Sequence, residues 1–161
     1  MLNFLDLYET YATEVYRFAL WLAGDPYDAE DITSETFIRA WLHNSRIRTE
    51  TLKAYLFAIA RNVYLNQRRK RKNQVLLDDV YPDPAPGPDK MVESQLELQS
   101  VRGVLHTLHE IDRAAFILRV QHELPYDEIA RILGLSLTAT KVKVHRARKK
   151  LLLTCADKEV S

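Results

Sequence analysis

Apolar side chains recur every three or four residues along three stretches in the first part of the chain. This spacing places them on one face of an α-helix, so each stretch predicts an amphipathic helix. No segment alternates apolar and polar residues as a half-buried strand would, and we therefore expect an all-α fold. The three apolar stripes are Phe4, Tyr8, Tyr11, Val15, Phe18 and Leu22; Ala29, Ile32, Thr36, Phe37, Ala40 and Trp41; and Leu52, Tyr55, Leu56, Ile59, Ala60 and Val63.

Three consecutive residues mark the boundary between the first two of these helices. Gly24 can adopt the left-handed backbone conformation that ends a helix. Asp25 can then cap the next helix with its carboxylate, and Pro26 suits the first turn because its missing N–H needs no partner there. We therefore expect the first helix to end at Gly24 and the second to follow directly.

The last third of the chain predicts a helix-turn-helix. Pro125 suits the first position of a short amphipathic helix, Gly134 can end it, and Ser136 can cap a new helix two residues later. Two helices joined in this way form the motif that lays its second helix in the major groove of DNA. Two further helices are expected before it, near 90–108 and 112–122. The buried stripe of the second motif helix is expected to be Leu137, Thr140, Val144, Ala147 and Leu151.

Four prolines at alternating positions between 82 and 88 interrupt the helical pattern. Proline at this density excludes a helix or a central strand and favours extended chain. We predict a linker at 74–90 that separates an N-terminal helical domain, 1–73, from a C-terminal one, 91–161. Seventeen extended residues span roughly 56 Å at most. The linker could therefore hold two DNA-binding surfaces more than one turn of DNA apart.

The formal net charge of the 161 residues is only +1, but the charges are segregated. Six basic residues and no acid lie at 61–72, and six more lie at 141–150. The connecting stretch 78–97 carries six acids against Lys90 alone. Local basic patches decide where nucleic acid binds, so two DNA-binding surfaces are expected. The plainer alternatives are a solvated basic face and a basic helix end that suits the helix dipole.

The predicted second helix has an acidic outer face, formed by Asp28, Glu30, Asp31 and Glu35. Acids near a helix N-terminus are stabilised by the helix dipole, which accounts for the first two. The dipole effect fades after the first turn and does not explain Glu35. A docking face for a basic partner helix is therefore an equal alternative.

Aromatic residues interleave with the basic positions of the predicted third helix. Tyr55, Phe57 and Tyr64 could stack on unpaired bases. Membership of the hydrophobic core is the alternative, and we favour it for Tyr55.

The sequence offers few of the groupings that catalysis or metal binding needs. Cys155 is the single cysteine, which excludes an intramolecular disulfide and a cysteine-rich metal site. We interpret His106 and His109 as surface or packing residues. No nucleophile–base pair, phosphate-binding glycine loop or metal constellation is evident, so neither an enzyme nor a cofactor is expected.

No apolar run approaches the ~20 residues of a membrane span, the N-terminus does not resemble a signal peptide, and a cytoplasmic location is expected.

Three segments together resemble the bacterial sigma-70 family of RNA polymerase sigma factors, in its extracytoplasmic-function (ECF) group. The stretch DAEDITSETFIRAW at 28–41 is similar to the family's core-polymerase-binding helix in region 2. The stretch YLFAIARN at 55–62, with the basic tail that follows, resembles the promoter −10 helix. The segment from PYDEIA at 125–130 to HRARKKL at 145–151 resembles region 4, which contacts the −35 element. The three segments follow in the family's order and at its spacing.

The resemblance implies a subunit for promoter-specific transcription initiation, with no covalent chemistry of its own. Its partners would be core RNA polymerase, through the largest-subunit clamp coiled coil and the flap, and promoter DNA. An anti-sigma factor is a further potential partner, no membrane is involved, and the free chain is expected to be monomeric. The side chains implied for polymerase binding are Asp28, Asp31, Glu35 and Arg39. Those implied for the −10 element are Arg61, Asn62, Arg68, Arg69 and Arg71, and the loop 43–51 would help to hold a flipped base. Those implied for the −35 element are Thr138, Lys141, Val142, Lys143, His145, Arg146 and Lys149.

The predicted recognition helix departs from the family pattern at two positions. The family commonly has Gly-Thr-Val-Lys-Ser-Arg where this chain has TATKVK at 138–143. Thr140 replaces a buried valine, and its hydroxyl is expected to bond back to a helix carbonyl. Val142 puts a methyl surface where a hydroxyl is usual and could contact a thymine methyl.

Two other classes of protein fit parts of the pattern. A free-standing regulator with a helix-turn-helix would usually dimerise to bind two half-sites, and no dimerisation helix is evident. An adaptor or anti-sigma-like interaction protein would not need two basic patches.

Overall fold

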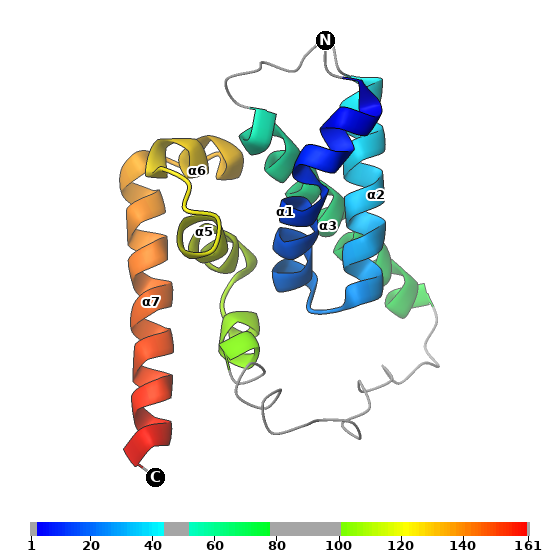
Figure 1. Ribbon diagram of the computed structural model, residues 1–161. Helices are drawn as coiled ribbons and strands as arrows, with labels where there is room; N and C mark the ends of the chain where they lie inside the picture. Colours follow the sequence, from blue (N-terminus) through cyan, green and yellow to red (C-terminus); the bar gives the residue numbers. More distant parts are fainter. Residues whose placement is uncertain (1–2, 44–51, 78–100, 161) are drawn as a thin grey trace.

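The computed structural model describes residues 3–43, 52–77 and 101–160, and within these ranges every regular element is a helix (Figure 1). The expected all-α fold is confirmed for the part of the chain that is described. The helices are α1 (Phe4–Ala23), α2 (Pro26–Leu42), α3 (Leu52–Leu77), α5 (Glu110–Val120), α6 (Tyr126–Leu133) and α7 (Leu137–Val160), and residues 101–107 are helical as well.

The N-terminal helices form a bundle in which α1 and α2 make an antiparallel hairpin and α3 packs against both (Figure 1). Gly24 ends α1 with a left-handed φ of 75°, and its N–H donates to the carbonyl of Leu20 at 2.8 Å. The Asp25 carboxylate accepts a bond from the N–H of Tyr27 at 3.0 Å, and Pro26 is the first residue of α2. The predicted boundary between these helices is confirmed.

The predicted apolar stripes are buried along most of their length but not at the free end of the hairpin. Phe4, Tyr8 and Trp41, which belong to these stripes, are all more than a third exposed. They pack on one another instead: the Phe4 ring lies edge-on to Trp41 with centroids 5.8 Å apart, and Tyr8 lies 5.1 Å from Phe37.

The helix-turn-helix is formed by α6, a tight turn and α7. Gly134 has a left-handed φ of 67°, and the Ser136 hydroxyl accepts the N–H of Ala139 at 3.1 Å, so the predicted turn and cap are confirmed. Thr140 donates its hydroxyl to the carbonyl of Ser136 at 2.8 Å, as expected for a buried threonine in a helix. Pro125 precedes the first turn as its N-cap instead of beginning it.

Leu137 is 45% exposed, although it was expected in the buried stripe. It is the first residue of α7, and helical side chains lean toward the N-terminus, so it leans off the end of the helix.

The predicted boundaries shift where helices continue into expected loops. The third helix runs on to Leu77, past the predicted domain end at residue 73, and the rest of the predicted linker lies outside the described residues. The helix expected near 90–108 is described only at 101–107, and α5 begins two residues before the expected 112.

The two halves of the chain pack against each other through one continuous hydrophobic cluster. In Figure 1, α5 lies between the N-terminal bundle and α7. Phe18 of α1 and Phe57 of α3 are completely buried, and both contact the ring of His122 just after α5, with centroids 5.9 and 4.7 Å away. The linker length predicted that the halves could separate, whereas the structure shows them closed.

Close backbone and polar contacts reinforce this interface. A Cβ on Gly24 would lie 2.8 Å from the imidazole Nε2 of His106, so a larger residue would require the His106 side chain to move. The buried Arg113 donates to the hydroxyl of Tyr64 at 2.7 Å. The glycine that ends α1 therefore has a second role, in the contact between the halves.

Acidification is expected to destabilise this interface through His122. Burial lowers the pKa of His122 from 6.5 to about 4, against the opposing effect of the Glu14 carboxylate. As the pH falls, the unfolded chain therefore binds this proton before the folded chain does. The free energy of unfolding keeps its full value above pH 6.5 and decreases as the pH falls from 6.5 toward 4. At pH 5 the loss is about 2 kcal/mol, from roughly 1.4 kcal/mol per pH unit. Denaturant unfolding of the wild type and of His122→Gln at pH 7.5 and 5 measures this loss. The difference between the two proteins in the free energy of unfolding should change by about 2 kcal/mol between the two pH values. An unchanged difference would show that His122 does not cause the pH dependence.

Candidate nucleic-acid interface

One face of α7 is buried and the opposite face is exposed and basic. Thr140, Val144 and Ala147 are fully buried in the core of the C-terminal half, which α7 shares with α5 and α6. The exposed residues recur at spacings of three and four, so they share one outward face. They are Thr138, Lys141, Val142, His145, Arg146 and Lys149, six of the seven side chains predicted for the −35 element.

Lys143 is the seventh side chain predicted for the −35 element, and it points elsewhere. Its side chain is only 22% exposed, and its Nζ lies 3.2 Å from Oδ1 of Asp112 on α5. Arg146 remains 60% exposed, with Nη1 3.9 Å from Oδ2 of the same carboxylate. Sequence reasoning missed Asp112 because it is distant in sequence from the helix that it contacts.

Tyr126 links the start of α6 to its neighbours. The guanidinium of Arg119 on α5 lies 4.3 Å from the centre of the Tyr126 ring, and the Nζ of Lys141 lies 5.8 Å from it on α7. Cations over an aromatic face are attracted by its quadrupole. Tyr126 therefore helps to hold the two helices of the motif together.

The side chains of α3 that were predicted to contact the −10 element fall into two groups. Asn62, Arg68 and Arg69 are exposed. Arg61 is held by Glu110 of α5 in a two-pronged ion pair, with Nε and Nη2 at 2.7 and 2.9 Å from the carboxylate oxygens. The two side chains are 14% and 12% exposed. Arg61, which was predicted to contact the −10 element, is therefore paired with a residue of the C-terminal half.

Arg71 and Asp28 pair with each other, although one was predicted to bind DNA and the other polymerase. The two terminal guanidinium nitrogens of Arg71, Nη1 and Nη2, donate to the Asp28 carboxylate, whose side chain is 12% exposed. The pair joins α3 to the first turn of α2. Asp28 therefore has a structural partner within the chain.

The outer face of α2 combines charged and apolar side chains. Asp31 is exposed, and Glu35 pairs with Arg39 at 2.6 Å, with side chains 44% and 41% exposed. Ile38 and Leu42 lie one turn apart on the same face and are 54% and 71% exposed. Sequence reasoning did not include these two apolar residues, although their spacing to Asp31 and Glu35 could have indicated them.

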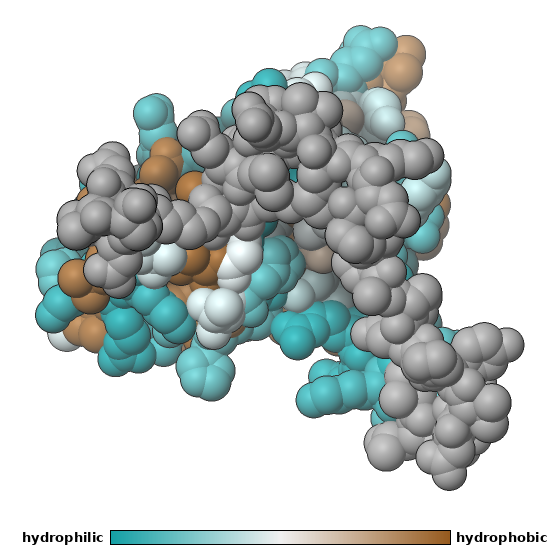
Figure 2. All heavy atoms as spheres, turned by 90° about the horizontal axis from the view of Figure 1, so that it is seen from below, coloured by the Kyte–Doolittle hydropathy of each residue, from teal (hydrophilic) through white to brown (hydrophobic). Residues whose placement is uncertain are grey.

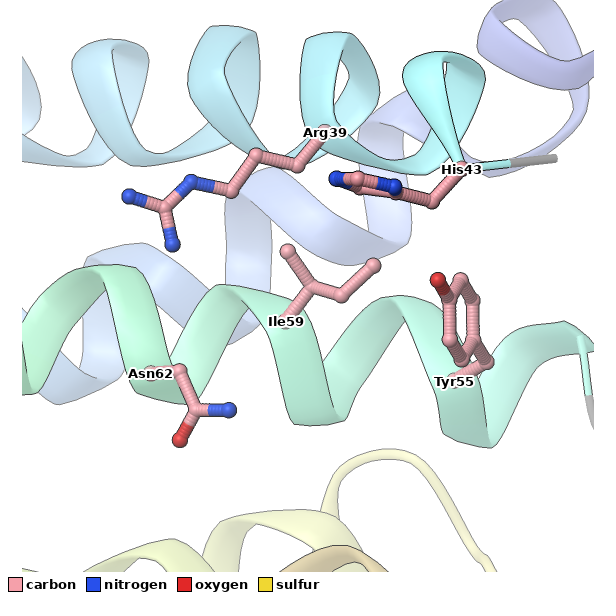
Figure 3. Close-up of a pocket in the computed structure, with 5 residues that line it drawn as sticks. All are labelled: Arg39, His43, Tyr55, Ile59 and Asn62. Atoms are coloured by element: carbon pink, nitrogen blue, oxygen red, sulfur yellow. The ribbon is translucent and has the colours of Figure 1, made fainter. Parts of the chain in front are cut away.

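A small hollow of about 270 Å³ lies between the end of α2 and the middle of α3 (Figure 3). Arg39 and His43 face it from α2, and Tyr55 and Ile59 face it from α3, with Asn62 at its edge. The residues that follow His43 lie outside the described chain, so the predicted base-holding loop at 43–51 is described only at His43. The hollow combines an aromatic ring, an apolar floor and polar donors.

The other two aromatics suggested for base stacking are not accessible in this arrangement. Phe57 is fully buried and Tyr64 is 6% exposed, both at the contact with the C-terminal half. The core alternative is therefore correct for these two residues, whereas Tyr55 is only half-buried.

Figure 2 shows the molecule from below, and hydrophilic side chains dominate the coloured surface, with hydrophobic ones in small patches. Among the helices of the described residues, none is long and apolar enough to cross a membrane.

The fold and the two basic surfaces define a helical DNA-binding protein with a helix-turn-helix in its second half. Residues 7–74 match the family model of sigma-70 region 2, and residues 98–151 match that of sigma-70 region 4. The ECF RNA polymerase sigma factor SigM of Bacillus subtilis is 31% identical over 151 residues, which cover 91% of each protein. SigL of Mycobacterium tuberculosis is 30% identical over 155 residues, which cover 94% of this chain and 88% of SigL.

The chain therefore belongs to the ECF group of sigma-70 family RNA polymerase sigma factors, which direct promoter-specific transcription initiation. This membership excludes the free-standing regulator and the adaptor as alternatives.

Solved structures share the same fold. The sigma factor RpoE in complex with the anti-sigma factor NepR from Bartonella quintana matches with a TM-score of 0.77 and 28% identity, over 92% of this chain and 94% of RpoE. CnrH in complex with the cytosolic domain of CnrY matches with a TM-score of 0.73 and 22% identity, over 96% of this chain and 88% of CnrH. The arrangement of the helices is thus one that the sigma factor RpoE also adopts.

Proposed function

We propose that the outward face of α7 contacts the −35 element in the major groove. The observation that carries this proposal is the segregation of α7 into a fully buried apolar face and an exposed basic one. A helix with this pattern can fit a major groove while its other side stays in the protein core. Val142 is 47% exposed on this face, where its methyl groups are available to a thymine methyl.

Arg146 is the only arginine among the seven side chains predicted for the −35 element, and its side chain is 60% exposed. Arg146→Ala should weaken binding to −35 DNA by ~1–3 kcal/mol and relax the preference at one base pair, as expected for a bidentate contact to guanine. Titration of duplexes with single base-pair changes measures both effects. Arg131→Ala removes an exposed cation from α6, outside the outward face of α7, and should leave the base preference unchanged. An equal loss on every duplex would instead make Arg146 a phosphate contact.

For the −10 element we propose the exposed basic end of α3 together with the hollow between α2 and α3. Arg68 and Arg69 are available to phosphates, and the Tyr55 ring offers a stacking surface for an extruded base. Asn62 at the edge can donate and accept hydrogen bonds. Arg39, implied as a polymerase contact, lines this hollow as well.

For core polymerase we propose the outer face of α2. Asp31, Glu35 and Arg39 supply the charges, and Ile38 and Leu42 supply apolar area beside them. An apolar centre with a charged rim is the usual composition of a protein interface. We assign Asp28 to the internal pair with Arg71, because its carboxylate is nearly buried.

The closed arrangement supports an order of events. One edge of the Arg61 guanidinium, Nε with Nη2, is bound to Glu110, and the side chain is only 14% exposed, so DNA has little access to it in the closed form. Promoter binding through Arg61 therefore requires the two halves to separate, and a partner that binds the separated form would shift the equilibrium by its differential affinity.

The remaining assignments follow from the class of protein. The −10 module is formed by residues 1–73, and its helix α3 extends to Leu77. The −35 module is formed by residues 91–161, on the other side of the linker. The chain works without catalytic activity, in the cytoplasm where polymerase and DNA are present. The likeness to RpoE bound by NepR supports an anti-sigma factor as a further partner.

A further inference from the structure

Asp112 lies in the first turn of α5, beneath the recognition helix. Its side chain is 4% exposed, and its two oxygens face two different cations of α7, Lys143 at 3.2 Å and Arg146 at 3.9 Å. Lys143 and Arg146 are three residues apart, so they project from neighbouring positions on one side of α7. One buried carboxylate therefore collects two basic side chains from the helix that is proposed to contact DNA.

The two cations are held differently. Lys143 is drawn inward, with its Nζ at hydrogen-bond distance from Oδ1. Arg146 stays largely exposed, and its Nη1 lies 3.9 Å from Oδ2, at ion-pair distance but beyond a hydrogen bond. A guanidinium has five N–H donors, so the contact leaves most of them available. A buried carboxylate without partners is unfavourable in free energy, so the contacts with Lys143 and Arg146 are stabilised.

We propose that Asp112 is a positioning residue for −35 recognition. It fastens Lys143 to the protein, which removes that cation from the DNA contact, and it restrains Arg146 so that the guanidinium is directed at the groove before DNA arrives. Restraint before binding reduces the side-chain entropy lost in the complex. The inference rests on the proposed role of the α7 face, and it changes the role of Lys143 from a DNA contact to a fastening residue.

A purely structural role for Asp112 predicts a different outcome. A carboxylate that only joined α5 to α7 would change the stability when replaced and leave base discrimination unaltered. A positioning role predicts changes in sequence discrimination and in salt dependence, because Arg146 gains freedom and Lys143 becomes available to phosphates. These two quantities therefore separate the alternatives.

The test uses the full chain and a duplex selected by the wild type from a randomised library, beside the same duplex with its selected base pairs scrambled. For Asp112→Asn we expect the preference for the selected duplex to fall about tenfold. On the scrambled duplex, the slope of log affinity against log salt should steepen by about 0.9, the value for one additional phosphate contact. Asp127→Asn is the matched control, because Asp127 forms an exposed pair with Arg131 on α6, and it should behave as the wild type.

The outcomes distinguish this inference from the function on which it rests. If the wild type selects no sequence, the role of α7 is wrong and the inference falls with it. If the wild type discriminates and Asp112→Asn discriminates equally, only the positioning role is overturned. Should Asp112→Asn fail to fold, Lys143→Gln decides: an unchanged salt slope supports a fastened lysine, and a slope reduced by about 0.9 overturns it.

Discussion

Replacing Glu110 with lysine should open the contact between the two halves of this sigma factor. Glu110 and Arg61 form a two-pronged ion pair in which both side chains are nearly buried. The variant would place a lysine against Arg61, and breaking a buried pair costs about 3–5 kcal/mol because a charge is left without its partner. Small-angle scattering of the free chain should show a larger radius of gyration, and binding of a single-stranded −10 probe should become tighter.

Two controls make this prediction specific. Glu9→Lys changes the same charge at an exposed position of α1 and should leave the radius of gyration unchanged. The exchange of both residues, Arg61→Glu with Glu110→Arg, restores opposite charges and should restore the compact form without restoring the −10 contact. A radius of gyration in Glu110→Lys equal to that of the wild type would show that the ion pair does not hold the halves together.

Reversing two charges on the outer face of α2 should abolish binding to core polymerase. Asp31 is exposed and Glu35 is partly exposed, so both carboxylates are available to a basic partner. With lysine at both positions, like charges would meet in the interface, at a cost of several kcal/mol. Capture of purified core polymerase by the tagged variant should fall at least a hundredfold, a factor that corresponds to about 2.7 kcal/mol.

The control reverses two acids on another helix. Asp6→Lys with Glu9→Lys on α1 makes the same change in net charge at two exposed positions. This variant should capture polymerase as the wild type does. Equal capture by the α2 variant would remove the docking role from α2, and equal loss in the control would make the effect one of net charge.

Sequence reasoning located the features that depend on neighbouring residues. Gly24, Asp25 and Gly134 were predicted because a left-handed turn or a cap depends on the residue itself and on the two or three positions around it. The hydroxyl bond of Thr140 was predicted for the same reason, since its acceptor is four residues away. The exposed face of α7 likewise follows from helical periodicity.

The sequence could not show contacts between residues far apart in the chain. Glu110 meets Arg61 across 49 residues, Arg71 meets Asp28 across 43, and Lys143 meets Asp112 across 31. Periodicity identifies which side of a helix is apolar, but it does not specify which other helix covers that side. The contact between the two halves was missed for this reason, although it decides which side chains predicted for the −10 element are exposed in the free protein.

Promoter-dependent transcription in a purified system measures whether this chain recognises both promoter elements. Purified core polymerase would be supplied with the wild-type chain and a template that carries the duplex selected by α7 upstream of a matching −10 segment. We expect transcripts from one defined start, which are lost when either element is scrambled. Transcripts that persist with a scrambled −35 element, or none from any template, would contradict recognition of the promoter at two points.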